Sequence, residues 1–302
     1  EYFYRTHCTL EPRVPESKIE RLRLQGCIQI VRNASLDAIL RLDKNRWQQC
    51  CHLYLSPMKL FHREKGKASL PPLIILHGLW GASDNWLQVA EILSTNFHVL
   101  LPDFRNHGHS PHADVHTYPA LAEDICEWIE SLHLKTPLFI AGHSMGGKCL
   151  MHILLKYPSI ATKAAIIDIA PKKYEQTEEH RQIIQFLKQF SFIKGESRAQ
   201  LHQRIRKELK DERICQILLK NIDKRENGFR WRINVTTILE SIQALMTWEN
   251  CTKRCKEPTL FIRGELSEYI QTNDVFTIKS LFPQAEFITI NGAGHWIHAQ
   301  QP

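Results

Sequence analysis

The sequence contains no segment typical of a membrane span or a secretion signal. No apolar run reaches the length of about eighteen residues that a membrane-spanning helix requires. The opening residues, EYFYRTHCTLEPR, lack the basic start, the apolar middle and the small-residue cleavage site of a signal peptide. They are also too acidic for a transit peptide. We therefore expect a cytoplasmic protein without a membrane span.

The cysteines are not spaced as they are in a small disulfide-bonded protein. There are nine, an odd number, and they are scattered along the chain, which is typical of reduced thiols in a cytoplasmic protein. The spacings of cysteine and histidine fit no common zinc site either. A disulfide framework and a structural metal are therefore not expected.

Positive charge is concentrated in one segment of the chain. The 302 residues carry a net charge of +7, and residues 172–256 hold nineteen Lys and Arg against eleven Asp and Glu. Stretches such as RIRKELKDER interleave both signs, which is typical of a solvated helical surface with ion pairs. The alternative is that this charge attracts an anionic substrate such as a coenzyme A thioester. No motif supports binding to nucleic acid.

Short apolar runs alternate with helical patterns over most of the chain. Amphipathic stretches such as LAEDICEWIESL and GGKCLMHILLKY lie between the runs. Nearly continuous apolar strands that alternate with helices predict a parallel sheet covered on both faces. The expected fold class is therefore α/β, with a doubly wound, mostly parallel sheet. The predicted strands are 73–78, 97–103, 138–142, 163–169, 259–264 and 286–292.

One long segment interrupts this alternation. Residues 172–256 contain amphipathic stretches and no convincing strand, which predicts a helical insertion after the strand that ends at Asp168. In a doubly wound sheet the carboxyl ends of the strands hold the ligand crevice, so the insertion is expected to act as a lid. The predicted domains are a core of residues 58–171 and 257–302, the lid at 172–256, and an N-terminal extension, 1–57.

The stretch AGHSMGGKC, residues 141–149, places a serine between two glycines at G-x-S-x-G spacing. An apolar strand pattern precedes it and a helical pattern follows it, which is the context in which such a serine acts as a nucleophile. The predicted turn is sharp, so side chains in place of Gly142 and Gly146 are expected to collide with it. Ser144 is thus the candidate nucleophile.

Four further motifs accompany GHSMGG, and their order along the chain carries a resemblance. They are HGLWGASDNW (77–86), DFRNHGHS (103–110), IDIAP (167–171) and GAGHWIHAQQP (292–302). From Met58 to Pro302 the chain resembles the α/β-hydrolase superfamily. Within it, the chain is similar to the small bacterial acyl esterases and their mitochondrial relatives of the alpha/beta-hydrolase domain 11 type.

Acyl transfer by a serine needs a base, and the base needs an orienting acid. His295 follows the last predicted strand, which matches the chain order of serine, acid and histidine in this fold. The commonest position for the acid holds Ser267 here, in RGELSEY. In the esterases that the chain resembles, the acid stands at the end of the preceding strand, which implies Asp168. Glu265 or Glu268 stays open as the alternative.

The remaining site residues are expected around the nucleophile. The backbone N–H groups of Leu79 and Met145 are the expected oxyanion donors. Trp80, Trp86 and Trp296 are expected to line the acyl pocket, although each is as compatible with an ordinary core position. His143, directly before the nucleophile, is a further candidate for substrate binding.

Polar residues after the second predicted strand have a structural interpretation. Asp103, Arg105 and Asn106 invite a catalytic role, but an acid and a base two residues apart more often pair or cap to hold a loop. We expect them to support the site. His298, three residues after His295, is expected to point toward the sheet and pack there.

These residues predict a serine esterase or thioesterase that acts on short to medium acyl groups through an acyl-enzyme. The first alternative is a lyase or C–C bond hydrolase that uses the same serine and histidine for proton transfer. The second is a non-catalytic or truncated hydrolase-like protein. The expected partner is a small-molecule acyl ester or thioester, and the site implies no cofactor. The oligomeric state, the acyl length and the leaving group stay open.

Overall fold

The computed structural model describes residues 58–209, 211–226, 228–249 and 251–302. The predicted N-terminal extension, residues 1–57, lies outside the described residues. Within them, no helix combines the length and the apolar character that crossing a bilayer requires.

A seven-stranded sheet forms the centre of the described part, in the order β1-β3-β2-β4-β5-β8-β9. All neighbouring strands pair in parallel except β1, which is antiparallel to β3. The predicted mostly parallel α/β fold is therefore confirmed, with each predicted strand within two residues of its position at either end. Within this sheet, only the edge strand β1 was not predicted, because its sequence HREK carries no apolar signal. The strands are β1 (His62–Lys65), β2 (Pro72–Leu76), β3 (His98–Pro102), β4 (Phe139–His143), β5 (Lys163–Ile167), β8 (Thr259–Gly264) and β9 (Ala285–Ile290).

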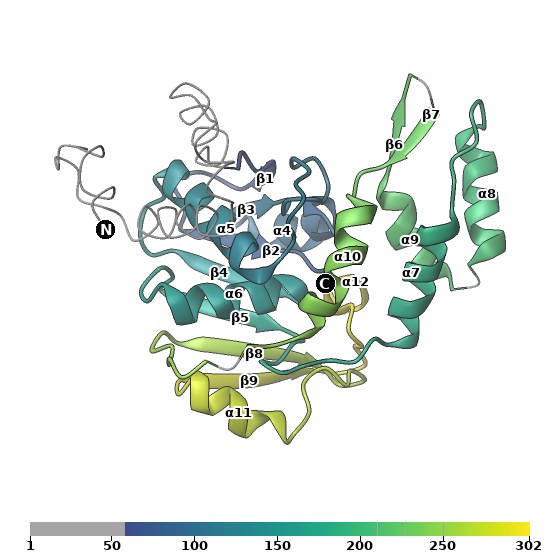
Figure 1. Cartoon of the computed structure of the whole chain (residues 1–302). Helices are drawn as coiled ribbons and strands as arrows, with labels where there is room; N and C mark the ends of the chain where they lie inside the picture. The colour runs from purple at the N-terminus through teal and green to yellow at the C-terminus, as the bar shows by residue number, and fades with distance from the viewer. Residues whose placement is uncertain (1–57, 210, 227, 250) are drawn as a thin grey trace, which may run out of the picture. The chain divides into compact units, whose positions relative to one another are not determined.

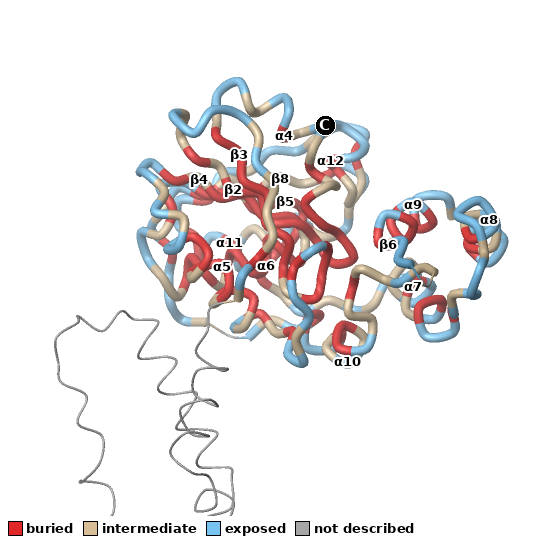
Figure 2. The backbone as a smooth tube through the Cα atoms, turned by 90° about the horizontal axis from the view of Figure 1, so that it is seen from above, coloured by how far each residue is buried: buried red, intermediate tan, exposed pale blue. Residues whose placement is uncertain are grey.

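Helices cover both faces of this sheet, as a doubly wound fold requires (Figure 1). Seen from above, α5 (Tyr118–Leu132), α6 (Met145–Lys156) and α11 (Asp274–Leu281) lie on one side of the strands (Figure 2). The 3₁₀ turn η2 (Ser83–Trp86) leads into α4 (Leu87–Leu93), which lies with α12 (Ile297–Gln300) on the other side. The apolar strand residues are buried between these layers, and Ile74, Leu76, Leu100, Ile140 and Phe261 are almost completely inaccessible.

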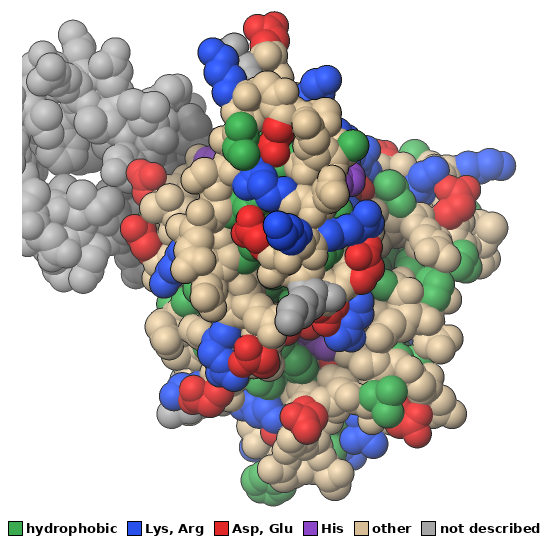
Figure 3. Space-filling view, turned by 90° about the vertical axis from the view of Figure 1, so that its right-hand side faces the viewer, with side chains coloured by type: hydrophobic (Ala, Val, Ile, Leu, Met, Phe, Trp, Pro, Cys, Tyr) green, Lys and Arg blue, Asp and Glu red, His purple; other side chains and the backbone are tan. Residues whose placement is uncertain are grey.

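The segment between β5 and β8 forms the predicted helical insertion. Its helices are α7 (Glu178–Gln189), α8 (Arg198–Glu208), α9 (Glu212–Lys220) and α10 (Val235–Met246). Side chains of Thr177, Ser197, Asp211 and Asn234 accept hydrogen bonds from the first turns of these four helices, which explains where each begins. Lys and Arg side chains alternate with acidic ones over this face (Figure 3). Many of them form ion pairs, such as Arg204 with Glu196.

The expectation that the insertion contains no strand was wrong. Residues Ile222–Arg225 and Gly228–Trp231 form an antiparallel hairpin, β6 and β7, with Ile222 opposite Trp231. Each strand has only four residues, and charged side chains occupy most of β6, so neither carries the apolar alternation that predicts a strand. Trp231 packs near the rings of Phe190 and Phe192, so tertiary contacts hold the hairpin in place.

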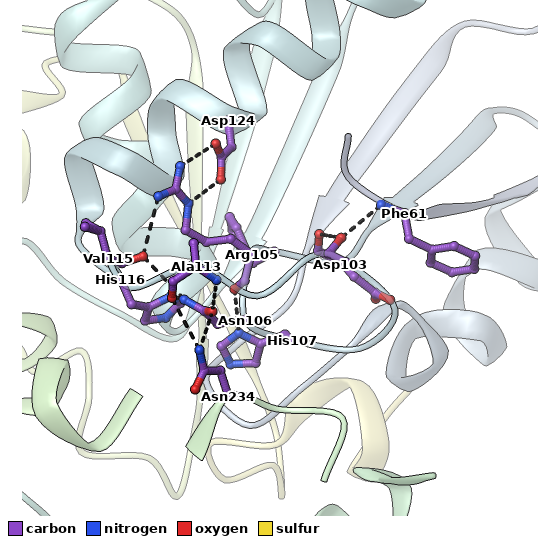
Figure 4. A network of polar contacts seen from close by, with 12 residues as sticks. Phe61, Asp103, Arg105, Asn106, His107, Ala113, Val115, His116, Asp124 and Asn234 are labelled. Carbon is purple, nitrogen blue, oxygen red and sulfur yellow. Dashed lines mark hydrogen bonds and ion pairs between the residues drawn. The ribbon is translucent and has the colours of Figure 1, made fainter. Parts of the chain in front are cut away.

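Polar residues after β3 hold the loops beside the nucleophile. The buried carboxylate of Asp103 accepts hydrogen bonds from the N–H groups of Ser83 at 2.6 Å and His109 at 2.8 Å. Arg105 donates two bonds to Asp124, at 2.5 and 2.6 Å (Figure 4). The Asn106 carbonyl accepts the N–H of Asn234 at 2.9 Å, which joins this loop to the start of α10. The expected supporting role of these residues is confirmed.

Gly108 lies against the Asp103 carboxylate in this loop. A substitution at Gly108 therefore tests how much the loop contributes to stability. Its φ is +56°, and a Cβ there would lie 2.1 Å from an Asp103 carboxylate oxygen. We predict that Gly108→Ala lowers the free energy of unfolding by at least about 3 kcal/mol, because the buried carboxylate loses its backbone donors. Urea unfolding followed by circular dichroism measures this change.

Gly195 provides the matched control. Its φ is also positive, at +82°, but a Cβ there would meet nothing within 4 Å. Gly195→Ala is expected to cost only the backbone term of about 1 kcal/mol. Equal destabilisation by the two substitutions would contradict a special role for the contact between Gly108 and Asp103.

Candidate active site

Ser144 stands at a sharp turn between β4 and α6. Its φ is 52° and its ψ is −117°, a conformation that a non-glycine residue rarely adopts. Two glycines allow the backbone to close around it. A Cβ on Gly142 would lie 2.5 Å from the Gly146 carbonyl oxygen, and one on Gly146 would lie 2.5 Å from the Leu76 carbonyl oxygen. The close approach that the G-x-S-x-G spacing predicts is therefore present.

His295 lies beside this hydroxyl, in the loop between β9 and α12. Its Nε2 is 3.0 Å from the Ser144 Oγ, and its Nδ1 is 2.7 Å from the Asp168 Oδ2. A carboxylate only accepts hydrogen bonds, so Nδ1 carries a proton and Nε2 is free to accept the hydroxyl proton. The structure thus brings together Ser144, His295 and Asp168, which lie after β4, β9 and β5.

The carboxylate that faces His295 is Asp168, and Glu265 points elsewhere. The Asp168 side chain is fully buried, while that of His295 is 17% exposed. Glu265 is exposed and accepts the N–H of Gly292 at 2.7 Å. Glu268 is also exposed. The geometry therefore favours Asp168 over both glutamates as the partner of the imidazole.

Ser267 contributes to the same carboxylate in a way that its sequence did not predict. Its hydroxyl donates to the Asp168 Oδ2 atom that also accepts from His295. The N–H of Gly264 donates to Oδ1 at 3.0 Å. These three donors compensate the buried negative charge and fix the carboxylate. Its position in the sequence could have indicated this role, because Ser267 stands where related hydrolases most often carry the acid.

The two expected oxyanion donors lie next to the nucleophile. Leu79, Ser144 and Met145 line one cavity. A Cβ on Gly78 would be 3.3 Å from the Ser144 Cβ, so the loop that leads to Leu79 packs directly against the serine. In the described part of the chain, neither the Leu79 nor the Met145 N–H donates to a protein acceptor. Met145 also begins α6, whose N-terminus carries a partial positive charge.

The cavity beside Ser144 is small, with a volume of about 30 Å³, and both aromatic and aliphatic side chains line it. Sequence reasoning missed most of its walls, because they come from the insertion and from loops after β5 and β8. Burial lowers the pKa of His180, which faces the cavity from α7, to about 4, so this side chain is neutral at pH 7. Besides the residues already named, the walls are Tyr118, Lys148, Ile169, Tyr174, Leu245, Met246 and Tyr269.

None of the expected substrate-contacting residues lines this cavity. Trp80 is buried, and its carbonyl accepts the side-chain amide of Asn221 at 2.6 Å. Trp86 stacks on His298 at 4.4 Å between ring centroids, so both belong to the packing beneath the site. Trp296 lines a separate cleft of about 280 Å³ against α9. Local contacts bury Trp80 and Trp86, whereas Trp296 is only partly buried at the wall of that cleft.

His143 forms a hydrogen bond with the backbone of His295, the candidate base. Burial lowers its pKa well below the usual range, so the imidazole is neutral. Its Nε2 donates to the His295 carbonyl at 2.8 Å, because a carbonyl only accepts. The direct substrate contact of His143 stays a prediction, and the contact that the structure shows is a hydrogen bond that holds the loop of the base.

Tyr269 covers one face of the His295 ring. The centroids are 3.7 Å apart and the planes are nearly parallel, at 13°. The Tyr174 hydroxyl donates to the Tyr269 carbonyl at 2.7 Å and so fixes the loop that carries this ring. The stack therefore helps to hold the His295 ring in the orientation in which its nitrogens face Ser144 and Asp168.

Chemically, the arrangement suits transfer of a proton from a serine hydroxyl to an imidazole. Among the described residues, no three His, Cys, Asp or Glu side chains gather in a way that would hold a metal ion. The groups that face the reacting hydroxyl are instead an imidazole, backbone N–H groups and aromatic rings.

Comparisons with known proteins agree with this architecture. The chain is 34% identical to "Esterase YbfF" of Escherichia coli, across 76% of this chain and 88% of that protein. It is 35% identical to "sn-1-specific diacylglycerol lipase ABHD11" of Xenopus tropicalis, across 78% of this chain and 76% of that protein. A solved "Marine microorganism esterase" superposes with a TM-score of 0.77 at 42% identity, covering 81% of this chain and 95% of that one.

The match to a family as a whole is equally extensive. Residues 71–302 match the family described as alpha/beta hydrolase fold, which is more than half of the chain. With the sheet order, the turn at Ser144 and the relatives above, this shows that the chain belongs to the alpha/beta hydrolase fold family.

Proposed function

We propose that this protein is a serine hydrolase that cleaves carboxylic esters or thioesters through an acyl-enzyme intermediate. One observation carries the proposal: the His295 imidazole bridges the Ser144 hydroxyl at 3.0 Å and the Asp168 carboxylate at 2.7 Å. The relatives named as esterases support the same class of reaction.

In the first half-reaction, the Ser144 Oγ attacks the substrate carbonyl carbon while its proton passes to the His295 Nε2. The carbonyl π electrons move to oxygen, and the N–H groups of Leu79 and Met145 donate to this oxyanion. One such donor contributes about 3 kcal/mol to transition-state stabilisation. The tetrahedral adduct then collapses, and the leaving alkoxide or thiolate takes the proton from the imidazolium. The products are the acyl-serine and a free alcohol or thiol.

In the second half-reaction, water takes the place of the departed group. His295 accepts one water proton, and the hydroxide oxygen attacks the acyl-serine carbonyl. Collapse of the second adduct breaks the bond to the Ser144 Oγ, which recovers the proton from the imidazolium. The net reaction adds one water molecule to one ester bond and restores the starting enzyme.

The neighbours of His295 act on its charge and orientation. Asp168 holds the tautomer with the proton on Nδ1 and stabilises the imidazolium without taking that proton. Ser267 positions Asp168, and Tyr269 covers the imidazolium face. The helical insertion acts as the lid, because His180, Leu245 and Met246 face the cavity from α7 and α10.

Replacing the nucleophile is the direct test. Ser144→Ala is expected to abolish labelling by a fluorophosphonate probe and to reduce p-nitrophenyl acetate hydrolysis by about 10⁶-fold, because no oxygen remains to form the acyl-enzyme. Ser280→Ala, at an exposed position on α11, is the matched control and should behave as wild type. Full probe labelling of folded Ser144→Ala protein would exclude Ser144 as the nucleophile.

Amide substitution separates the candidate acids. Asp168→Asn preserves the shape of the side chain but no longer fixes the required tautomer, and kcat is expected to fall by about 10⁴-fold. Glu265→Gln should change kcat by less than about threefold, since the Gly292 N–H is the only hydrogen-bond partner of its exposed carboxylate among the described residues. Steady-state kinetics on one soluble ester measures both. The reverse ranking would assign the acid role to Glu265.

A further inference from the structure

Lys148 is a buried lysine in the wall of the candidate acyl cavity. It lies four residues after Ser144 on α6, one helical turn further on, and both residues line the cavity. Only 1% of its surface is accessible. Burial of an ammonium group is costly unless other groups compensate the charge. The partners of Lys148 therefore indicate what the residue does.

Backbone carbonyls at one helix end provide these partners. The Lys148 Nζ lies 2.8 Å from the Thr247 oxygen, 3.3 Å from the Met246 oxygen and 3.5 Å from the Leu245 oxygen. These residues form the C-terminal end of α10, where the helix dipole places partial negative charge. Within the described residues, no carboxylate pairs with this ammonium group. The helix end thus takes the place of a counter-ion.

Two tyrosines complete the attachment. The Lys148 Nζ lies 4.9 Å from the ring centroid of Tyr174 and 5.8 Å from that of Tyr118, within the range of cation–π attraction. The Tyr118 hydroxyl also donates to the Leu245 carbonyl at 3.0 Å, and the Tyr174 N–H donates to the Met246 carbonyl at 2.8 Å. The end of α10 is therefore fastened to the helix that carries the nucleophile and to two neighbouring segments.

This attachment limits the space beside Ser144. The cavity beside Ser144, at about 30 Å³, is far smaller than the cleft of about 280 Å³ beside Trp296. Four residues of helix rise separate Ser144 from Lys148, which is about 6 Å. An acyl chain that extends along α6 therefore soon meets Leu245 and Met246, which Lys148 holds in place.

We propose that Lys148 sets the upper limit on acyl length by fastening the C-terminal end of α10 across the cavity, so that the enzyme selects short acyl groups. The inference rests on the proposed serine hydrolase function and adds the substrate class. Lys148 is a positioning residue here, because it acts through Leu245 and Met246 and takes no part in bond cleavage.

Chain-length profiles test this role. The experiment measures kcat/KM of the full chain on p-nitrophenyl acetate, butyrate, hexanoate and octanoate. Wild type is expected to prefer acetate, with a steep fall toward octanoate. Lys148→Met keeps the length of the side chain but loses the charge and the donors. It is expected to raise the octanoate-to-acetate ratio of kcat/KM by at least about tenfold, mainly through a lower KM for octanoate.

Lys156→Met is the matched control on the same helix. The Lys156 ammonium lies over the Tyr157 ring, away from the cavity. Its removal should leave the chain-length profile unchanged. A uniform loss of activity at all chain lengths in Lys148→Met would indicate a merely structural lysine and would overturn the proposal. Wild type that hydrolyses octanoate as well as acetate would also overturn it.

A second variant covers the case in which Lys148→Met does not fold. Lys148→Gln keeps two N–H donors on a shorter, uncharged side chain, so it should shift the profile in the same direction by a smaller amount; an unchanged profile counts against the proposal. Failure of the proposed function itself looks different. In that case wild type would neither react with the fluorophosphonate probe nor hydrolyse any of the esters.

Discussion

The hydrogen-bonded chain from Asp168 through His295 to Ser144 is the constraint on which the rest of the site depends. Its members follow three different strands, β5, β9 and β4, so the 2.7 and 3.0 Å contacts exist only when the parallel sheet is assembled in register. Neighbouring parallel strands end at the same edge, and this edge is where each chain segment turns. A register shift in any of these strands would separate the groups by more than hydrogen-bond reach.

Buried charge sets the second constraint. Asp168 is fully enclosed, and three donors compensate it, from His295, Ser267 and Gly264. Lys148 is enclosed as well, but carbonyls and rings compensate it instead of a carboxylate. Burial lowers its pKa to about 7, which is the expected direction for an ammonium without a full negative partner. Three hydrogen-bond donors thus compensate the charge of Asp168. Lys148 depends instead on the C-terminal end of α10, which belongs to the insertion.

The sequence predicted those parts of the molecule that local patterns specify. Apolar runs predicted the strands, and the glycines around Ser144 predicted the sharp turn, because both depend on residues close in the chain. The order of motifs predicted that His295 would meet the serine, and the resemblance implied Asp168 as its partner while Glu265 and Glu268 stayed open. Ser267 was assigned no role, since a serine carries no charge and its contact with Asp168 spans 99 residues of chain. Trp296 and His143 were predicted to lie in the pocket because both are close to a catalytic motif in the sequence. The sequence does not show in which direction a side chain points.

The residues that the sequence missed or misplaced depend on contacts between segments far apart in the chain. These contacts also indicate how the site is built. The polar chain belongs to the sheet, whereas Leu245 and Met246 belong to α10 of the insertion. Besides the contacts of Lys148, polar contacts between the insertion and the core include the Asn221 amide on the Trp80 carbonyl and Arg232 on Asp84. Polar contacts of this kind are specific in geometry but modest in net energy. Changes in the insertion can therefore alter the volume beside Ser144 while the sheet keeps the reacting groups in register.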